Sequence, residues 1–393
     1  MRYIGIDIGA EHHVVAAVDE EAQVLLRPAR FTEDALGYSK LKEWLGAVAD
    51  TLVGMEATGH YWQNLFAFLV AEGFKVVLIN PLRTRRFAQE DLERTKTDAI
   101  DALGIASFLR QKRPAPLGLP DEATRELREL VRLRDQLVGA VGEYVNRLHR
   151  LVDLGFPEFT RHVRDLDGPL ATALLARYPT ARAFASEKPR RLAKRVYASR
   201  NAVGDQLATA LIEAAKSSVG AHHGEAYRVQ VRYACEHLVL LRRQLREVSG
   251  DIDRTIASHE LGKLLVTIPG VGPQTAARVL TEAGDLSAFR DGNALASFAG
   301  LVPGLRHSGK HNPSSARLSP VGNAKLRRGL YMPTLVAVRR NPWLRSFYER
   351  LVARGKPKKL ALAAAARKLL LAIHSVVKHR RAFIPHLAHE ATS

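Results

Sequence analysis

The stretch YIGIDIGAEHHVVAAVDEEAQVLLRPARF, residues 3–31, decides the fold of the N-terminal region. Apolar residues run or alternate through residues 3–8, 12–18 and 23–31, and a polar corner at residues 19–21 separates the last two runs. This pattern predicts three strands joined by tight turns. Further strands expected at residues 52–56 and 75–79 alternate with helices, one capped by Thr32 and one at residues 62–71. We therefore expect an α/β domain with a mixed central sheet and helices on its faces.

The chain has 393 residues, of which 46% are apolar and 25% charged, so it is long enough for two or three domains. Its one cysteine, Cys235, cannot form an internal disulfide, which favours a reducing compartment. The apolar run at residues 2–8 is interrupted by Asp7, and the run at residues 360–366 lies between Lys359 and Arg367. Neither run has the form of a signal peptide or a membrane span, so we expect a cytoplasmic protein with no membrane partner.

The net charge of +19 is concentrated at the C-terminal end. Residues 301–393 hold 19 Lys and Arg against two acids, Glu349 and Glu390, whereas residues 1–300 are close to neutral. A folded segment with so few acids repels itself unless a polyanion neutralises it, and nucleic acid is the usual polyanion. The sequence therefore predicts nucleic-acid binding by this segment. The alternative is a basic tail that serves solubility or membrane-surface contact.

Four carboxylates occupy related places on the N-terminal scaffold. Asp7 lies inside the first expected strand and Glu56 ends a later one. Asp98 and Asp101 lie three residues apart in a helix that begins near Thr97, so both project from one face. If that helix packs beside the sheet, the four acids form a cluster whose repulsion hard divalent cations relieve. The spacing therefore predicts a magnesium or manganese site, of the kind that serves phosphoryl transfer.

Each acid also has a structural explanation. Asp7 can be a strand-end acid that meets a lysine, and Asp98 and Asp101 lie among basic residues that would form an ordinary surface of salt bridges. The phrase GIDIG also fits actin-like ATPase domains, in which the acid and the glycines handle nucleotide. The sequence contains no GxxxxGK[ST] motif, which weakens that alternative.

The middle of the chain has the pattern of long helices. Leucine and valine recur three or four residues apart over residues 122–154, and a second helix is expected at residues 229–248. The first of these is typical of a coiled-coil strand, and the two helices can pair antiparallel or with another subunit. Residues 160–225 are broken by three prolines and Gly204, and no role follows from their sequence.

Two motifs of the C-terminal region point to phosphate. Residues 265–276, LVTIPGVGPQTA, predict a helix, a turn at Gly270 and Gly272, and a second helix at residues 274–282. Such a helix-hairpin-helix holds a phosphate with free backbone N–H groups, although a plain packing turn gives the same pattern. Further on, Ser308 lies in a cationic loop, where a hydroxyl can bind a phosphate or attack it. The chemistry alone favours binding, because no Ser-His-Asp order is visible.

Taken together, these motifs resemble a known family. GIDIG with Asp7, GMEATGHY with Glu56, KTDAIDA with Asp98 and Asp101, and the intervening NPLRTRRFA resemble the RuvC-like N-terminal domain of DEDD-type insertion-sequence transposases. This family includes the bridge-RNA-guided recombinases and the related Piv-type DNA invertases. GLVPGLRHSGK and SPVGNAKLRR, with the text that follows to Leu370, resemble the C-terminal transposase domain of the same family. The resemblance covers roughly residues 1–112 and 261–380.

The resemblance implies a role for each motif. It implies that the four acids hold Mg²⁺, with Mn²⁺ as the alternative, and that Ser308 attacks the scissile phosphodiester to form a covalent phosphoserine. The two domains would then make a composite site across subunits. The same loop contains three other serines, Ser314, Ser315 and Ser319, which are rival nucleophiles. It also contains His307, which directly precedes Ser308. The expected nucleic-acid contacts are Gly270, Gly272, Arg306, Lys310, Arg317, Lys325, Arg327 and Arg328.

We therefore expect three domains: a RuvC-like, ribonuclease-H-like α/β domain at residues 1–118, an α-helical coiled-coil connector at 119–258, and a mainly α transposase domain with a helix-hairpin-helix at 259–393. The expected function is that of a DNA recombinase or transposase. Family resemblance further implies donor and target DNA, a structured guide RNA and a homodimer or tetramer as partners. The alternatives are a RuvC-like four-way-junction endonuclease and a non-catalytic nucleic-acid-binding protein.

Overall fold

The computed structural model describes residues 1–57, 59–90, 97–116, 122–304, 317–318 and 321–385. The chain divides into two compact units, unit 1 (Met1–Pro120) and unit 2 (Asp121–Ser393). Unit 1 holds the expected α/β domain. Unit 2 holds both the long helices and the C-terminal region.

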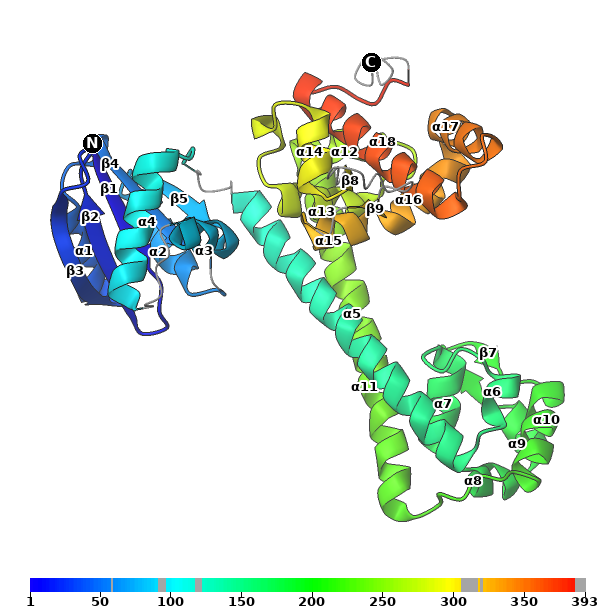
Figure 1. Ribbon diagram of the computed structural model, residues 1–393. Coiled ribbons are helices and arrows are strands. Elements are labelled where there is room, and N and C mark those ends of the chain that lie inside the picture. Colours follow the sequence, from blue (N-terminus) through cyan, green and yellow to red (C-terminus); the bar gives the residue numbers. More distant parts are fainter. Residues whose placement is uncertain (58, 91–96, 117–121, 305–316, 319–320, 386–393) are drawn as a thin grey trace, which may run out of the picture. The chain divides into compact units, whose positions relative to one another are not determined.

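Unit 1 is built on a five-stranded sheet with the order β3-β2-β1-β4-β5 (Figure 1). The strands are β1 (Arg2–Asp7), β2 (His12–Val18), β3 (Val24–Thr32), β4 (Thr51–Glu56) and β5 (Lys75–Ile79). The first three strands pair antiparallel, whereas β4 pairs parallel with both β1 and β5. The mixed sheet that the sequence predicts is therefore confirmed.

Helices cover both faces of this sheet. The helices of unit 1 are α1 (Ala35–Leu45), α2 (Trp62–Ala71), α3 (Pro81–Glu90) and α4 (Asp98–Lys112), with a short 3₁₀ turn, η1 (Val48–Asp50). Ile4, Ile6 and Val53 point to one face and pack with residues of α1 and α2. Tyr3 and Leu52 point to the opposite face and pack with residues of α3 and α4. Alternation along the strands thus gives each face its own core.

Two details of unit 1 differ from the prediction. Thr32 ends β3, where it pairs with His12, so it is not the cap of α1. The cap is Asp34, whose side chain accepts a hydrogen bond from the Gly37 N–H at 2.7 Å. The prediction also includes no helix directly after β5, whereas Pro81 begins α3. Proline fits a first helical position because its missing N–H has no partner there.

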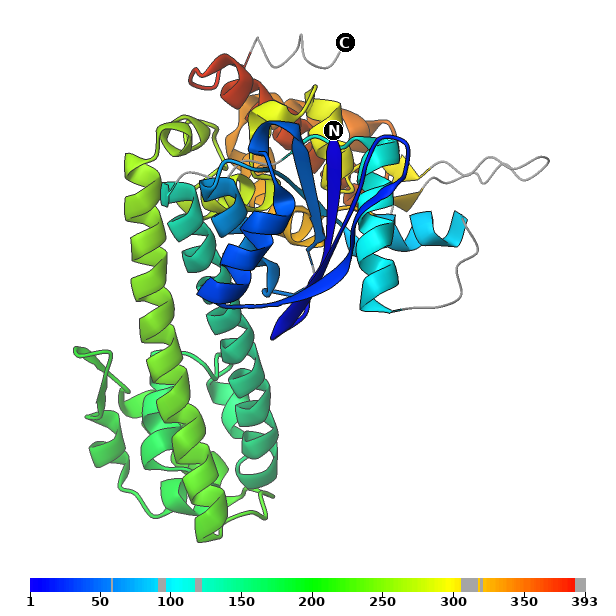
Figure 2. The same cartoon turned by 90° about the vertical axis from the view of Figure 1, so that its left-hand side faces the viewer.

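Two long helices form the frame of unit 2. They are α5 (Glu122–Gly155) and α11 (Glu225–Ser258), and they lie antiparallel along each other in both views (Figures 1 and 2). Tyr144 of α5 stacks on His237 of α11 at 4.9 Å between ring centroids. Of the two arrangements left open by the sequence, the structure therefore has the antiparallel pair within one chain.

A subdomain of short elements connects the distal ends of α5 and α11 (Figure 1). Its elements are α6 (Phe159–His162), α7 (Pro169–Arg177), α8 (Ala181–Ala185), α9 (Pro189–Ala193), β6 (Val196–Tyr197), β7 (Asn201–Ala202) and α10 (Asp205–Lys216). Phe156, Phe159 and Phe184 meet in its core together with residues of both long helices. The segment of unknown role thus shares a hydrophobic core with the distal ends of α5 and α11.

The other end of the long helices packs into a larger helical core. Its elements are α12 (Glu260–Leu265), α13 (Pro273–Ala283), η2 (Leu286–Ala288), α14 (Gly292–Phe298), β8 (Pro303–Gly304), β9 (Arg317–Leu318), α15 (Ala324–Gly329), α16 (Tyr331–Arg340), α17 (Pro342–Ala353) and α18 (Lys358–His379). Leu127 and Ile256 from the long helices join this core. The region is mainly α, as the sequence predicts.

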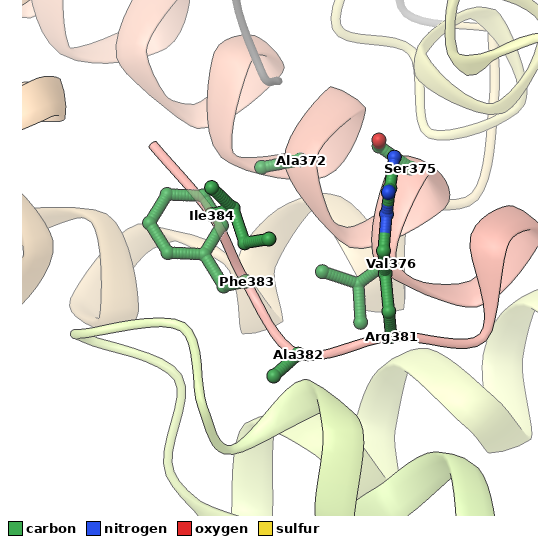
Figure 3. A pocket seen from close by; sticks show the side chains of 7 residues that line it. All are labelled: Ala372, Ser375, Val376, Arg381, Ala382, Phe383 and Ile384. Atoms are coloured by element: carbon green, nitrogen blue, oxygen red, sulfur yellow. The ribbon is translucent and has the colours of Figure 1, made fainter. Parts of the chain in front are cut away.

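Helix α18 is long and apolar enough to cross a membrane, but 67% of its most apolar window is buried inside the protein. Its burial among α14, α16 and α17 accounts for its composition, as in the core helix of a globular domain. The chain after α18 folds back so that Phe383 and Ile384 line a small depression with Ala372 and Val376 (Figure 3). The lining is mostly apolar, so this depression reflects packing of the C-terminal segment.

Candidate active site

The ends of strands β1 and β4 place two of the predicted carboxylates side by side. Gly5 pairs with Gly54 and Ile6 with Met55 in the parallel ladder, so the next residues, Asp7 and Glu56, end neighbouring strands. Because side chains alternate along a strand, both acids share the sheet face of Gly5 and Gly54. This is the face that α4 covers.

Two glycines let α4 approach this face closely. A Cβ atom on Gly5 would lie 2.0 Å from the carbonyl oxygen of Ala102, and one on Gly54 would lie 2.7 Å from the side chain of Leu109. Both distances are too short for a real side chain. The glycines therefore set the distance between the sheet and α4, and they bring the start of α4 to the carboxylate end of β1 and β4.

The first turn of α4 carries the other two predicted carboxylates. Thr97 caps the helix by accepting a hydrogen bond from the Ile100 N–H at 3.3 Å, and Asp98 and Asp101 follow in the first turn. Acids are favourable there because the helix N-terminus carries a partial positive charge. Asp101 is half-buried, whereas Asp98 is 62% exposed and forms an ion pair with Arg30 at 3.6 Å. Asp98 thus leans toward β2 and β3, where it lines an open pocket with Val14 and Arg30.

Glu56 has a partner that the sequence did not indicate. The hydroxyl of Thr84, which is buried in α3, donates a hydrogen bond to the Glu56 carboxylate. Thr84 lies 28 residues further along the chain, and α3 was itself not predicted. A single Thr within the basic segment of residues 81–88 does not indicate this contact.

The turn that follows Asp7 is also fixed by a buried side chain. The Gly9 N–H donates to Nδ1 of His13 at 3.3 Å, and Nε2 of His13 lies 2.7 Å from Oε2 of Glu33. Tyr38 donates a further hydrogen bond to Glu33 at 2.6 Å. Burial alone would raise the pKa of Glu33, but these hydrogen bonds outweigh it and hold that pKa below its usual range. The network therefore anchors the backbone beside Asp7.

The four carboxylates offer oxygen ligands, which suit a hard divalent cation. The sheet register and α4 gather them at one end of one layer of unit 1. Within the described part of the chain, however, no three His, Cys, Asp or Glu side chains converge closely enough to hold a metal ion. Coordination by Asp7, Glu56, Asp98 and Asp101 therefore stays a prediction.

The predicted nucleophile, Ser308, lies outside the described residues, as do Arg306, His307, Lys310 and the rival serines Ser314, Ser315 and Ser319. The structure describes the two ends of their loop. Pro303 pairs with Leu318 and Gly304 with Arg317, so β8 and β9 form an antiparallel pair that closes the loop. Of the predicted phosphate contact Arg317, the structure describes the backbone position in β9.

The base of this loop is tightly closed. A Cβ atom on Gly322 would lie 2.5 Å from the Gly300 nitrogen, and both glycines have positive φ angles. The Arg327 guanidinium donates to the Ala299 carbonyl at 3.2 Å, so this predicted phosphate contact also clamps the loop base. Lys325 and Arg328 are exposed on the same helix, α15, and face solvent.

The glycine turn between α12 and α13 has two distinct halves. Gly270 has a φ of 103°, and a Cβ atom there would lie 2.5 Å from that of Ala337, so it is required for packing against α16. Gly272 precedes α13, and a Cβ atom there would meet nothing within 4 Å. The predicted helix, turn and helix are present. Phosphate binding by this turn stays a prediction. Of the two glycines, Gly272 is the one with open space beside it for a ligand.

An ion-pair network that the sequence did not indicate joins α5, α13 and α15. Arg278 of α13 donates two hydrogen bonds to Asp135 of α5 and lies 3.8 Å from Glu282. The Asn323 side chain donates to Glu282 at 3.0 Å and also caps α15. The hydrogen bonds to Asp135 raise the pKa of Arg278 further. The network therefore fixes the basic helix α15 against α5 and α13.

Two family models match this chain. The DEDD transposase model named for IS110 matches residues 4–157, and the model of the transposase IS116/IS110/IS902 family matches residues 262–349. Such a DEDD domain indicates the use of a divalent metal ion.

Curated relatives match over nearly the whole chain. The insertion element IS116 protein of Streptomyces clavuligerus is 28% identical over 385 residues, which cover 98% of this chain and 96% of the relative. The pilin gene-inverting protein of Moraxella bovis is 26% identical over 388 residues and 97% of each chain. The insertion element IS110 protein of Streptomyces coelicolor is 28% identical and covers 96% of this chain and 94% of its own. The chain therefore belongs to the IS110/IS116 family of transposases, enzymes that cut DNA and rejoin it.

Proposed function

We propose that this transposase cuts and rejoins DNA through attack of Ser308 on the scissile phosphate, assisted by a divalent cation that Asp7, Glu56, Asp98 and Asp101 hold. The observation that carries the proposal is the placement of these acids at the joint end of β1, β4 and α4. The strand order β3-β2-β1-β4-β5, with antiparallel and then parallel pairs, supports a RuvC-like, ribonuclease-H-like fold for unit 1.

The proposed step is a phosphoryl transfer without net oxidation. The Oγ atom of Ser308 forms a bond to phosphorus, its proton passes to solvent, and the bond from phosphorus to the leaving deoxyribose oxygen breaks. Arg306 and Lys310, which flank Ser308, would stabilise the developing negative charge. Attack of a DNA hydroxyl on the phosphoserine then rejoins a strand and releases Ser308. Bound Mg²⁺ or Mn²⁺ would supply further neutralisation of charge at the phosphate.

The proposal also includes partners for this chemistry. We extend the proposal to donor and target DNA, a structured guide RNA that selects them, and a homodimer or tetramer in which unit 1 of one subunit and unit 2 of another complete the site. One family model matches residues 4–157, which are nearly all of unit 1 and α5 of unit 2, and the other matches residues 262–349 of unit 2. Both parts of the proposed composite site therefore lie in segments that match the family, which supports the proposal. The strong basic excess of residues 301–393 supports contact with nucleic acid at this site, inside the cell.

Covalent capture tests the proposal. The full chain is incubated with Mg²⁺, its co-purifying RNA and labelled DNA that carries the sequences flanking its own gene. A protein–DNA adduct that survives denaturation is expected for the wild type, and for Ser315→Ala as the matched control, but not for Ser308→Ala. Cleavage that persists in Ser308→Ala without an adduct would favour a four-way-junction endonuclease, and absence of all strand breakage would favour a binding protein.

The guide RNA has its own test. Digestion of the co-purifying RNA with ribonuclease is expected to abolish site-directed cleavage, and addition of the same RNA after removal of the ribonuclease is expected to restore it. Cleavage at the same site in the ribonuclease-treated sample would contradict guidance by RNA, and it would leave the serine mechanism to be judged by the adduct alone.

A further inference from the structure

The distal subdomain of unit 2 carries a concentrated positive surface. Residues 188–204 contain six Lys and Arg and no acid. Five of these cations are exposed, and one of the five, Arg191, forms an ion pair with Glu187. We name as the distal basic surface the other four, Lys188, Arg190, Lys194 and Arg200, which come from α9, its flanks and the loop between β6 and β7. This surface is separate from the basic excess of residues 301–393 on which the proposed function depends.

The cations of this surface have little internal neutralisation. Glu187, the nearest acid in the sequence, lies 3.9 Å from Arg191 and accepts a hydrogen bond from Tyr178 at 2.7 Å. Within the residues that the structure covers, none of the four cations of the distal basic surface forms an ion pair with a carboxylate. Four exposed positive charges within 13 residues therefore repel one another, and an external polyanion would relieve that repulsion.

The fold holds these cations in place. The Val203 N–H donates to the Arg195 carbonyl and the Gly204 N–H to the Ala193 carbonyl, each at 3.0 Å, so the base of the β6–β7 hairpin is closed. The loop turns through Ala198 and Ser199, whose φ angles of 47° and 69° lie in the left-handed region that such residues rarely adopt. Arg200 follows directly, so the hairpin presents it from a defined and strained turn.

The composition of the surface identifies the kind of polyanion. Single-stranded nucleic acid is bound on exposed aromatic rings, on which the bases stack. The one aromatic residue within residues 188–204 is Tyr197, which is half-buried. Cations without a stacking platform suit the phosphate backbone of a duplex, which they contact without reading the bases. The enzyme acts on DNA, so DNA is the duplex that this surface meets during the reaction.

The long helices set the distance of this surface from the C-terminal core. Leu127 belongs to the C-terminal core and Leu151, also in α5, belongs to the distal core. At 1.5 Å per residue they lie about 36 Å apart along the helix. One turn of B-DNA has nearly the same length, about 34–36 Å. A duplex held at the C-terminal core can therefore reach the distal basic surface about one turn away.

From these observations we propose that the distal basic surface binds the phosphate backbone of duplex DNA that flanks the site of cleavage. The contact adds affinity and fixes the direction in which the flanking DNA leaves the enzyme, without specifying sequence. It involves none of the residues assigned to the chemistry, so Asp7→Asn and Ser308→Ala enzymes are expected to retain it.

The test measures binding of the full chain to a nonspecific DNA duplex of about 40 base pairs, or four helical turns, by fluorescence anisotropy over a range of salt concentrations. The test variant is Arg190→Ala/Lys194→Ala/Arg200→Ala. The matched control is Arg228→Ala/Arg243→Ala/Arg254→Ala, which removes the same charge from three exposed arginines of α11, each paired with an acid of its own helix. Thermal unfolding of all three proteins checks that the exposed substitutions leave the fold intact.

The test variant is expected to bind at least about ten-fold more weakly than wild type, with a salt slope smaller by about 2 to 3, since each lost phosphate contact removes about 0.9 from the slope. The control variant is expected to bind within about two-fold of wild type, because its cations are already neutralised by acids. Equal weakening of the two variants, or none, would overturn the proposal. An RNA duplex of equal length serves as a second arm, and a loss confined to RNA would equally overturn it.

Discussion

Gly5 of β1 and Ala102 of α4 are in direct contact, because a Cβ atom on Gly5 would lie 2.0 Å from the Ala102 carbonyl oxygen. This contact sets how closely the first turn of α4 approaches the end of β1. It therefore sets how closely Asp98 and Asp101 approach Asp7, so the carboxylate end of unit 1 depends on a residue without a side chain.

Gly5→Ala is expected to push α4 away from the sheet. Overpacking of this kind lowers the free energy of unfolding by about 1–3 kcal/mol, and the displaced acids should leave strand cleavage undetectable. Gly104→Ala is the matched control, because Gly104 lies on the same helix and a Cβ atom there would meet nothing within 4 Å. It should be neutral or slightly stabilising in a helix. Equal thermal unfolding and cleavage for both variants would contradict this role of Gly5.

Thr84→Val tests the contact with Glu56. Valine keeps the shape of threonine but removes the hydroxyl that donates to the carboxylate, so Glu56 loses the hydrogen bond that orients it. We expect cleavage to fall about ten-fold or more while DNA binding stays within about two-fold of wild type. Thr84→Ser should restore most of the activity. Full cleavage by the valine variant would show that Glu56 needs no such support.

Asp7→Asn separates chemistry from binding. The substitution keeps size and removes the negative charge that a divalent cation requires. Strand transfer should be abolished, whereas retention of DNA on a gel should be close to that of wild type. If retention fell as much as strand transfer, Asp7 would have a folding role rather than a role at the scissile phosphate.

The ion pair between Asp135 and Arg278 predicts a pH dependence of stability. Burial alone would raise the pKa of Asp135, but the hydrogen bonds and charge of Arg278 outweigh it and hold the pKa below the ordinary value near 3.8. A lowered pKa in the folded state means that the pair stabilises the fold above about pH 4 and that this contribution is lost as the pH falls through the folded-state pKa.

Asp135→Asn should therefore lower the free energy of unfolding in urea by about 1–2 kcal/mol at pH 7, a value reduced for the partial exposure of Asp135. The difference from wild type should shrink as the pH falls below about 4, where the carboxylate of the unfolded chain becomes protonated, and should vanish once the pH is below the folded-state pKa. Asp251→Asn, in an exposed pair with Arg254, is the control and should change stability by less than about 0.5 kcal/mol. A difference that stays constant with pH would contradict the assignment.

Local patterns predicted much of unit 1. The helix Trp62–Ala71 and the strand Lys75–Ile79 have the predicted bounds, because their apolar periodicity is strong and their ends carry turn residues. Helix α3 is not among the predicted elements, because a proline such as Pro81 suits both the position after a strand and the first turn of a helix. In the distal subdomain, helices of four or five residues are too short to show a period, so no local pattern predicts their shared core.

The residues of the candidate site also divide into those that the sequence predicts and those that it does not. The acids Asp7, Glu56, Asp98 and Asp101 were visible because each lies at the end of an element with a clear pattern. Thr84 and the pair of Arg278 with Asp135 were not, because they meet residues 28 and 143 positions away in the chain. Contacts of that range depend on how elements pack, and no local pattern records them.

The most direct measurement of the central claim is the position of the covalent bond between the enzyme and DNA. After reaction with Mg²⁺ and nuclease trimming, trypsin would cut after Arg306 and Lys310, so Ser308 would lie alone in the peptide of residues 307–310, apart from Ser314 and Ser315 in residues 311–317. Mass spectrometry should find nucleotide on the first peptide, and none when Asp7→Asn enzyme is used. Nucleotide on the second peptide, or on neither peptide despite strand cleavage, would contradict the account.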